Sequence, residues 1–313
     1  AGATGATEGE HRMALGTTVG AATGREARPG AARLSSRLGR LLLYGVAILG
    51  AVVFMLPFMW AFFSSLKTSQ EIFDFPPKWL PAVPQWSNYA DVMTIVPFAR
   101  WTWNTFVITA LSLVGTVLTA SLVAYPFARF QYPGRDLIFL ITLSTLMLPL
   151  EVTLIPQYLI FRDLGWLDSF LPLIVPSFFG GGAFYIFLLR QFFMTLPTEL
   201  DEAARIDGAS AWRIFWNIIM PLSGPALATV AVLHFVASWH AFLIPLIFLN
   251  SPENFTASVG LRYFVVPQGA GVEKPRDQML MAASLMVAAP CVVLFFMTQR
   301  YFVRGIVMSG IKG

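Results

Sequence analysis

Six long apolar runs dominate the sequence, and each is bounded by Arg, Lys, Asp or Glu. A bilayer core about 30 Å thick takes roughly 20 apolar helical residues to cross. Every run is close to that length, which predicts an all-α polytopic membrane protein with six transmembrane helices. The predicted helices cover residues 41–66, 105–128, 137–160, 171–189, 226–249 and 279–297.

The composition indicates that lipid, rather than water, surrounds most of the chain. Of the 313 residues, 56% are hydrophobic and 12% are charged, and the mean hydropathy is +0.66. Such a chain has too few polar side chains to cover a soluble globule. The first run is longer than the apolar part of a removable signal peptide and lacks the small-residue cleavage site. We therefore expect it to stay in the membrane as an anchor.

The polar segments at the two ends divide the chain into three parts. Residues 1–38 are rich in Gly, Ala, Thr and Arg without apolar periodicity, which predicts a disordered cytoplasmic tail. Residues 39–304 are predicted to form the six-helix transmembrane domain. Residues 305–313 are predicted to be a short cytoplasmic C-terminal tail.

The positions of the basic residues indicate the orientation, since Lys and Arg are retained on the cytoplasmic side. If the N-terminus is cytoplasmic, most of the 21 basic residues fall in the tails and loops of that side. This predicts that both termini are cytoplasmic. The same bias, with attraction to anionic lipid headgroups, accounts for the pI near 9.4, so no nucleic-acid partner is implied.

The most informative polar segment lies between the fourth and fifth runs, at residues 197–225, and we call it the elbow. Thr198 is placed to cap a first helix whose first turn is acidic, which suits the positive end of the helix dipole. Asp201 and Arg205 are four residues apart and are predicted to pair along one face. The sequence therefore encodes a helix start strongly at this point.

A glycine corner and a second helix are predicted to follow. Gly208 can take the left-handed conformation that ends a helix, and Ser210 can cap the next helix at residues 211–220, which Pro221 stops or kinks. Alanines around the corner would let another protein approach the backbone closely. The alternative is a helix lying on lipid headgroups, which suits the apolar second helix. An anionic leaflet would repel the acidic first helix, so a basic protein groove fits it better.

The elbow contains the pattern E-A-A, three residues, G, nine residues, I, one residue and M-P. The residues of the pattern are Glu202, Ala203, Ala204, Gly208, Ile218, Met220 and Pro221. This pattern resembles the EAA signature of importer permeases in the ATP-binding cassette superfamily, and the one departure is Met220 in place of Leu. The resemblance extends over most of the chain after residue 41 and is closest to the MalG-like permeases of carbohydrate uptake. Supporting stretches are Asn104–Thr105, residues 125–134, residues 299–305 and Lys312–Gly313.

This resemblance implies a non-catalytic subunit of the bacterial plasma membrane that takes a sugar or a sugar-like solute into the cell. Residues 202–208, including Asp207, would form a coupling helix seated in a cleft of a cytoplasmic ATPase dimer, where Glu202 would meet a basic residue. The chain has no phosphate-binding loop motif of its own, so ATP would be bound by the ATPase. A second homologous permease and an extracytoplasmic solute-binding protein would complete the assembly.

A solute path needs broken helices and a few polar groups inside the bundle. The third run contains Pro149 and Glu151, the one carboxylate inside any run, which is either a path residue or an interfacial residue of a shorter helix. Trp239 and His240 occupy a place where similar permeases often carry Trp-Asn-Glu or Trp-Asn-Asp. His240 is either a path residue or a packing residue. The fourth run is broken by prolines and by glycines at 180–182.

Two other classes of membrane protein fit the sequence less well than the importer does. An ion-coupled secondary transporter would be expected to have several buried carboxylates and inverted repeats. An intramembrane hydrolase predicts a nucleophile and a base at one depth, such as the G-x-S-x-G motif, which is absent from the sequence. Both leave the elbow unexplained. Within the importer class, the sequence leaves open a disaccharide, another oligosaccharide, a polyol or a glycerol phosphate derivative.

Overall fold

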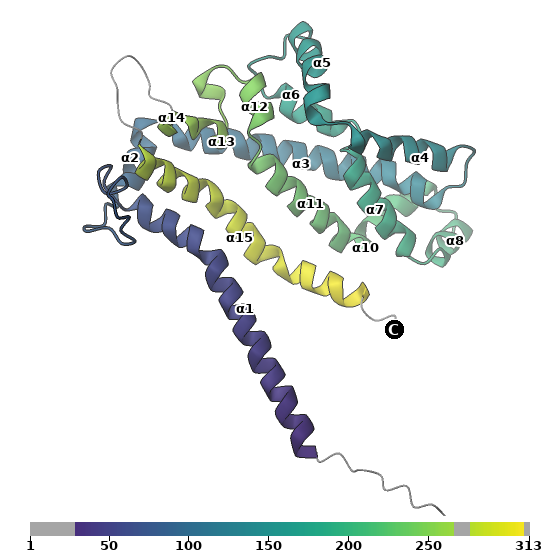
Figure 1. Cartoon of the computed structure of the whole chain (residues 1–313). Helices are drawn as coiled ribbons and strands as arrows, with labels where there is room; N and C mark the ends of the chain where they lie inside the picture. Colours follow the sequence, from purple (N-terminus) through teal and green to yellow (C-terminus); the bar gives the residue numbers. More distant parts are fainter. Residues whose placement is uncertain (1–28, 266–275, 310–313) are drawn as a thin grey trace, which may run out of the picture. The chain divides into compact units, whose positions relative to one another are not determined.

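The computed structural model describes residues 29–265 and 276–309. Within these two ranges it describes the side chains of residues 39–299. The described residues are helical and contain no strand, which confirms the predicted fold class (Figure 1). The chain divides into two compact units, residues 1–56 and 57–313. The helices are α1 Pro29–Ser65, α2 Ser87–Ile95, α3 Phe98–Arg129, α4 Arg135–Ser144, η1 Thr145–Met147, α5 Leu150–Asp163, α6 Leu171–Ile174, η2 Val175–Phe178, α7 Ala183–Thr195, α8 Glu199–Ile206, α9 Ala211–Ile214, η3 Phe215–Ile219, α10 Met220–Leu222, α11 Gly224–Trp239, α12 Leu243–Phe248, η4 Pro252–Asn254, α13 Ala257–Gly260, α14 Arg262–Val265 and α15 Asp277–Ser309.

Both terminal helices extend beyond the predicted transmembrane runs. Helix α1 begins at Pro29, inside the segment predicted to be a tail, because residues 31–38 contain Ala, Leu and Arg, which favour helix and adjoin the apolar run. Residues 1–28 lie outside the described residues. Helix α15 likewise continues to Ser309, into the predicted C-terminal tail.

Four helical segments are long and apolar enough to cross a membrane, and two bent pairs raise the number to six if each pair is one span. The four are Gly39–Ser65, Phe98–Arg129, Leu171–Thr195 and Asp277–Gln299. The bent pairs are Arg135–Met147 with Leu150–Asp163, and Ala211–Leu222 with Gly224–Trp239. The predicted number of spans agrees with the upper count, but three of the predicted spans, the third, fourth and fifth, are not single continuous helices.

The third predicted span, residues 137–160, is wrong as one continuous helix. Its two arms, α4 with η1 and then α5, are bent by 96°. Pro149 lacks the amide hydrogen that a continuing helix needs, and it forces the preceding Leu148 into an extended conformation with ψ 117°. Glu151 consequently lies in the first turn of the second arm, with an exposed side chain.

The fifth predicted span, residues 226–249, is also interrupted. Helix α11 ends at Trp239 and α12 begins at Leu243, with a non-helical break between them. Pro245 explains the break, because its ring would clash with the carbonyl group of Ala241 four residues earlier in a continuous helix. The membrane-crossing candidate is instead α11 together with the elbow helix before it, bent by 76°.

The fourth span is broken where the sequence predicts it. After α6 and η2 the chain is non-helical through the glycines at 180–182 and becomes helical again in α7. Gly181 has φ +66°, and a Cβ atom there would lie 2.7 Å from the Thr116 carbonyl oxygen of α3. Glycine therefore allows the broken backbone to pack directly on α3, where protein rather than lipid surrounds it.

Helix α3 packs against many of the other helices of residues 57–313, among them α7 and α11, which lie along it (Figure 1). It takes part in two buried hydrophobic clusters. At its start Phe98 and Trp101 pack with residues of α2, α13 and α15. Near its end Ala120 and Ala124 pack with α7 and the elbow. At about 1.5 Å per residue, this helix of 32 residues spans roughly 48 Å between its ends.

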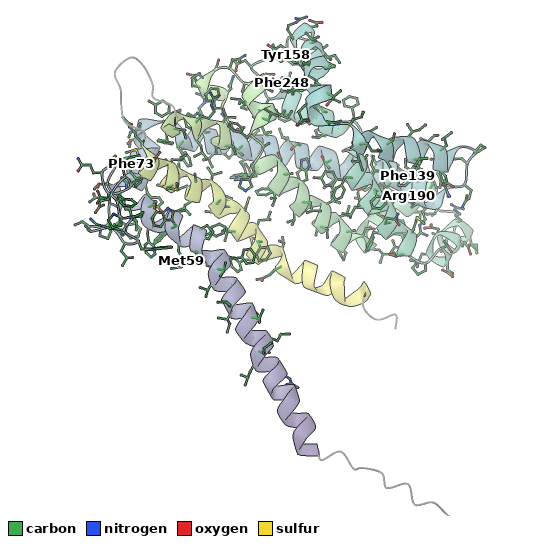
Figure 2. The ribbon with its side chains drawn as sticks, in the orientation of Figure 1. Met59, Phe73, Phe139, Tyr158, Arg190 and Phe248 are labelled. Atoms are coloured by element: carbon green, nitrogen blue, oxygen red, sulfur yellow. The ribbon has the colours of Figure 1, made fainter. Side chains whose placement is uncertain are left out.

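Asp168 joins two loops at the end of α3 that is remote from the elbow. Its Oδ1 atom accepts hydrogen bonds of 2.9 Å from the backbone N–H groups of Asn250 and Ser251, and Oδ2 accepts one from the Ser251 hydroxyl. The Asn254 amide donates to the Asp168 carbonyl oxygen at 2.8 Å. These bonds hold the pKa of Asp168 at about 2, mainly through Ser251. Nearby, Tyr158 of α5 stacks on Phe248 of α12 with ring centroids 6.1 Å apart (Figure 2).

We predict that Asp168→Asn loosens this junction. Asn tolerates the positive φ of 57° at this position but is a weaker acceptor than a carboxylate. Hydrogen exchange of residues 249–255 should become several-fold faster in the variant. Because the folded pKa lies below the unfolded value, the stabilisation is complete above about pH 4 and declines as the pH falls towards 2. Wild type and variant should therefore converge in acid.

The matched control is Asp163→Asn, since Asp163 lies in the same region and forms an exposed ion pair with Arg162. This control should leave the exchange of residues 249–255 unchanged. Equal exchange in Asp168→Asn and wild type at neutral pH would contradict the assigned role.

Candidate functional site

The elbow has the predicted two helices and glycine corner. Helix α8 covers Glu199–Ile206, and Gly208 takes the left-handed conformation at φ +78°. The Ser210 hydroxyl caps the next helix by accepting a hydrogen bond from the N–H of Arg213 at 3.4 Å. The predicted side-chain cap by Thr198 is wrong: its φ and ψ are helical, so the side chain is not in capping geometry. Its carbonyl oxygen accepts from the N–H of Asp201 instead.

The second helix runs from Ala211 to Leu222 and contains a π-helical turn, η3, between α9 and α10. Pro221 cannot donate to the carbonyl group four residues earlier and would clash with it in a regular helix. A wider turn just before the proline relieves that clash. The helix therefore continues slightly beyond the predicted end at residue 220 and bends into α11.

The two faces of α8 differ sharply in exposure. Asp201 and Ala204, three residues apart, are buried against the body of the protein. Glu202, Ala203 and Asp207 are exposed, and Ile206 is 87% exposed. An apolar side chain this exposed, next to acidic residues and a small alanine, provides a surface suited to another protein.

A buried ion pair attaches α8 to α3. Arg129 Nε, at the end of α3, lies 3.2 Å from Asp201 Oδ2, and the two side chains are 3% and 8% exposed. The predicted pair of Asp201 with Arg205 is therefore wrong. Arg205 is exposed, whereas Asp201 faces the interior, so the two side chains do not meet. The partner of Asp201 is Arg129, which lies more than seventy positions earlier in the sequence.

The pair is held by charge and enclosure more than by aligned hydrogen bonds. Within the described residues, Arg129 Nε and Nη2, Asp201 Oδ1 and the neighbouring Tyr125 hydroxyl have no hydrogen-bond partner. The Nε to Oδ2 approach is thus an electrostatic contact. Each buried charge depends on the other, because removal of either would leave its partner uncompensated.

Arg190 provides a second tie at the same end of α3. Its Nε donates a hydrogen bond of 3.1 Å to the Phe127 carbonyl oxygen, and its guanidinium carbon lies 4.2 Å from the centre of the Phe139 ring (Figure 2). Helices α7, α3 and α4 are joined by these contacts. The end of α3 that carries Arg129 is therefore in contact with α4 and α7 as well as with the elbow.

The structure does not bring the three predicted path residues together at one site. Trp239 is buried, donates a hydrogen bond of 2.8 Å to the Val287 carbonyl oxygen and stacks on Phe235, so it packs α11 against α15. His240 is exposed at the break after α11. Glu151 lies on the separate arm α5.

A polar cluster between α3 and α11 was not predicted from the sequence. Ser112 Oγ lies 3.0 Å from His234 Nε2, and Thr109 Oγ1 lies 3.2 Å from Ser238 Oγ. Ser238 also lines a cavity of about 200 Å³, together with Thr105 and Thr256. The spacing of these polar residues could have indicated the cluster. Thr109 and Ser112 are three residues apart, and His234 and Ser238 are four apart, so each pair lies on one face of its helix.

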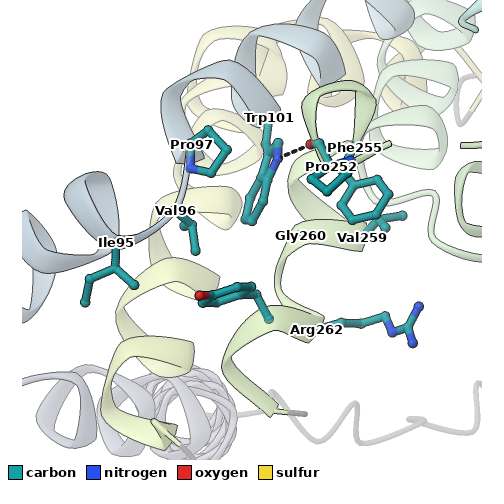
Figure 3. A pocket seen from close by; sticks show the side chains of 10 residues that line it. Ile95, Val96, Pro97, Trp101, Pro252, Phe255, Val259, Gly260 and Arg262 are labelled. Carbon is teal, nitrogen blue, oxygen red and sulfur yellow. Dashed lines mark hydrogen bonds between the residues drawn. The ribbon is translucent and has the colours of Figure 1, made fainter. Parts of the chain in front are cut away.

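A larger pocket of about 390 Å³ opens at the start of α3, between that helix and residues 252–263 (Figure 3). The Trp101 ring forms one wall of the pocket, and its indole N–H donates a hydrogen bond of 2.7 Å to the Pro252 carbonyl oxygen. The lining is mostly apolar, with Arg262 at the edge. This pocket lies at the opposite end of α3 from Arg129.

We predict that Asp201→Leu alone destabilises the folded protein by about 3–5 kcal/mol, because it leaves the Arg129 charge buried and unpaired. The double variant Arg129→Met, Asp201→Leu should recover most of this loss, since both charges are gone. Thermal unfolding of the purified protein in detergent measures the difference. If the double variant loses the sum of the two single effects, the residues are not coupled as described.

Sequence relatives cover nearly the whole chain. It is 35% identical over 268 residues to the sn-glycerol-3-phosphate transport system permease protein UgpE of Yersinia enterocolitica, which covers 84% of this chain and 94% of that protein. It is 33% identical over 291 residues to the arabinooligosaccharides transport system permease protein AraQ of Halalkalibacterium halodurans, which covers 90% of this chain and 99% of that protein.

A solved structure shares the fold. It is the crystal structure of a bacterial ABC transporter involved in the import of the acidic polysaccharide alginate, with a TM-score of 0.74 and 24% identity, covering 86% of this chain and 98% of the matched one. Residues 116–307, which include the elbow, match the family described as binding-protein-dependent transport system inner membrane component. The chain therefore belongs to the family of inner membrane components of binding-protein-dependent transport systems.

Proposed function

We propose that this chain is the membrane-spanning permease subunit of an ATP-driven importer, and that the exposed face of α8 is where an ATPase partner docks. The observation that carries the proposal is the elbow, with Ile206 87% exposed beside acidic residues and Asp201 buried beneath. Family membership and the relatives support the same function. The chain is a transport subunit rather than an enzyme, and ATP is bound by the partner.

The exposed face of α8 specifies what the partner surface must offer. Ile206 requires an apolar depression, and Glu202 and Asp207 require basic groups at its edge. Ala203 lets the two backbones approach closely. A cleft in a cytoplasmic ATPase dimer with a basic rim would satisfy all three requirements.

Movement at the docked elbow would reach the membrane helices through Arg129. Closure of the ATPase dimer would displace α8, and the buried Arg129–Asp201 pair would carry the displacement to the end of α3. Because α3 reaches both buried clusters, motion at one end would change packing at the other. The cavity beside Ser238 lies along this helix and offers hydroxyl groups to a solute.

Docking to a cytoplasmic ATPase requires the elbow to be cytoplasmic, which agrees with the distribution of basic residues. Both termini would then be cytoplasmic. The pocket at Trp101 would face the outside, where a solute-binding protein would contact the chain around residues 252–263. A second homologous permease would complete the translocation path.

The proposed solute is polyhydroxylated: a sugar, an oligosaccharide or a polyol phosphate. Relatives are named for sn-glycerol 3-phosphate and for arabinooligosaccharides, which share clustered hydroxyl groups. The hydroxyl groups of Thr105, Ser238 and Thr256, which line the cavity between α3 and α11, suit such a ligand better than an apolar one.

We predict that Glu202→Lys abolishes co-purification of the ATPase while the variant still inserts in the membrane, since it repels a basic partner group. Affinity purification of the tagged permease, with quantification of the ATPase, measures this. Glu199→Lys is the matched control, because it makes the same charge change at the exposed start of the same helix, away from the corner. Normal ATPase recovery with Glu202→Lys would count against the docking face.

The corner can be tested in the same assay with Gly208. Space around Gly208 is open, so a substitution there changes the backbone preference without a steric clash. Gly208→Val should weaken association, because left-handed geometry costs a β-branched residue roughly 1–2 kcal/mol. Gly208→Asn should keep most of the association, since Asn tolerates that conformation. Equal association of the two variants with the ATPase would show that the left-handed conformation at Gly208 does not determine docking.

The solute class can be tested with the reconstituted complex and its solute-binding protein. We expect ATP hydrolysis to rise on addition of sn-glycerol 3-phosphate or an oligosaccharide, and not on addition of an amino acid. Mass spectrometry of solute that co-purifies with the binding protein identifies the compound independently. Stimulation by amino acids or metal ions alone would overturn the carbohydrate-like assignment while leaving the importer function intact.

A further inference from the structure

The loop between α1 and α2, residues 66–86, exposes an unusual number of large apolar side chains. We call it the aromatic loop. Phe75 is 94% exposed, and six such residues of the loop are exposed in all, whereas a soluble loop of this size would normally be polar. The exposed residues are Phe73, Phe75, Trp79, Leu80, Val83 and Trp86.

The aromatic loop has a defined conformation fixed by its own polar groups. Glu71 accepts hydrogen bonds of 3.0 Å from the N–H groups of Thr68 and Ala82, which closes the loop across its width. These bonds hold the pKa of the Glu71 carboxyl below its usual range. Lys67 donates a hydrogen bond of 2.6 Å to the Lys78 carbonyl oxygen. The apolar side chains therefore project from a fixed frame.

Contacts with α1 set the depth of the aromatic loop. The Trp79 ring packs edge-on against Trp60, with centroids 5.1 Å apart, and Trp86 packs against Phe62 at 6.4 Å. Trp60 lies five residues before the end of α1, or about 8 Å back along the helix axis. The loop thus folds back beside the last turns of a membrane-crossing helix instead of projecting away from it.

That depth corresponds to the boundary between headgroups and hydrocarbon. The membrane-crossing part of α1 has 27 residues, about 40 Å of helix, whereas the hydrocarbon core is about 30 Å thick. Its ends therefore reach roughly 5 Å into the headgroup region on each side. Trp79 and Trp86 lie where tryptophan is enriched in membrane proteins, with an apolar body and a polar N–H group.

We propose that the aromatic loop is an interfacial anchor that seats residues 66–86 in the bilayer surface at the C-terminal end of α1. The occupant of its exposed face is lipid, because the loop is continuous with the membrane surface of α1 and contacts that helix at interfacial depth. Which leaflet this is depends on the orientation proposed above, but lipid contact does not.

The anchor would fix the end of α1 relative to the buried hydrophobic cluster that α2 forms with the start of α3. Asn88 of α2 donates hydrogen bonds to the carbonyl oxygens of Ser65 and Lys67, at 2.8 and 3.0 Å. Gln278 of α15 donates one of 2.6 Å to the Ser69 hydroxyl. The aromatic loop would therefore hold three helix ends at the level of the membrane surface.

The test places a nitroxide label at Phe75→Cys or Val83→Cys, in a Cys291→Ala background, in the complete importer complex. The complex is reconstituted in vesicles of phosphatidylethanolamine and phosphatidylglycerol without solute-binding protein. Both labelled side chains are exposed, so the substitutions remove little packing. Collision rates with molecular oxygen, which partitions into lipid, and with a water-soluble nickel chelate are measured for each label.

We expect the ratio of oxygen to nickel collisions at both positions to be several-fold higher than at Asp74→Cys, the neighbouring polar control. Ile48→Cys, exposed in the middle of the membrane-crossing run, gives the reference for lipid. Nickel access equal to that of Asp74→Cys would show that the loop faces water and overturn the proposal. Low access to both reagents would show a protein partner on this face and overturn it equally. Neither outcome would bear on ATPase docking at α8.

Discussion

The buried contact between Arg129 and Asp201 is the interaction on which the arrangement of the elbow depends. Two opposite charges with side chains 3% and 8% exposed stabilise the structure only as long as they stay together. One belongs to the end of α3 and the other to the inner face of α8. The pair therefore determines which face of α8 is turned inward. Glu202, Ala203 and Ile206 are presented outward as a consequence.

This constraint explains why α8 combines features that conflict in isolation. Three acidic residues in its first turn favour the helix through its dipole, yet one of them is buried. Burial of a carboxylate is costly unless a cation accompanies it. Arg129 supplies that cation, and Ala204 on the same inner face of α8 belongs to the buried apolar cluster that includes Ala124 and Phe127 of α3. The acidic helix is thereby attached to a membrane helix without losing its exposed acidic surface.

The elements set by local sequence were predictable, and those set by distant contacts were not. The apolar runs, the glycine corner at Gly208 and the cap at Ser210 depend on residues close in sequence, and the structure shows each of them. The partner of Asp201 could not be found in this way, because Arg205 has the right spacing and only the packing shows that it faces outward. The hydroxyl cluster of Ser112 and His234 likewise required knowledge of which helices are neighbours.

The interrupted spans show the same difference between what local sequence determines and what distant contacts determine, and they are relevant to function. Proline predicts that a helix is disturbed near residues 149 and 245, but hydropathy alone joins the segments on either side into one run. Backbone that is not helical must be covered by protein or line a cavity at membrane depth. Gly181 meets this requirement by packing on α3, and the break after Trp239 adjoins the cavity lined by Ser238 and Ala241. Helix α3 is uninterrupted from Phe98 to Arg129, so a displacement at one end can reach the broken helices that pack along it. The elbow contacts α3 at the Arg129 end, which is where a displacement imposed from outside would be transmitted most directly.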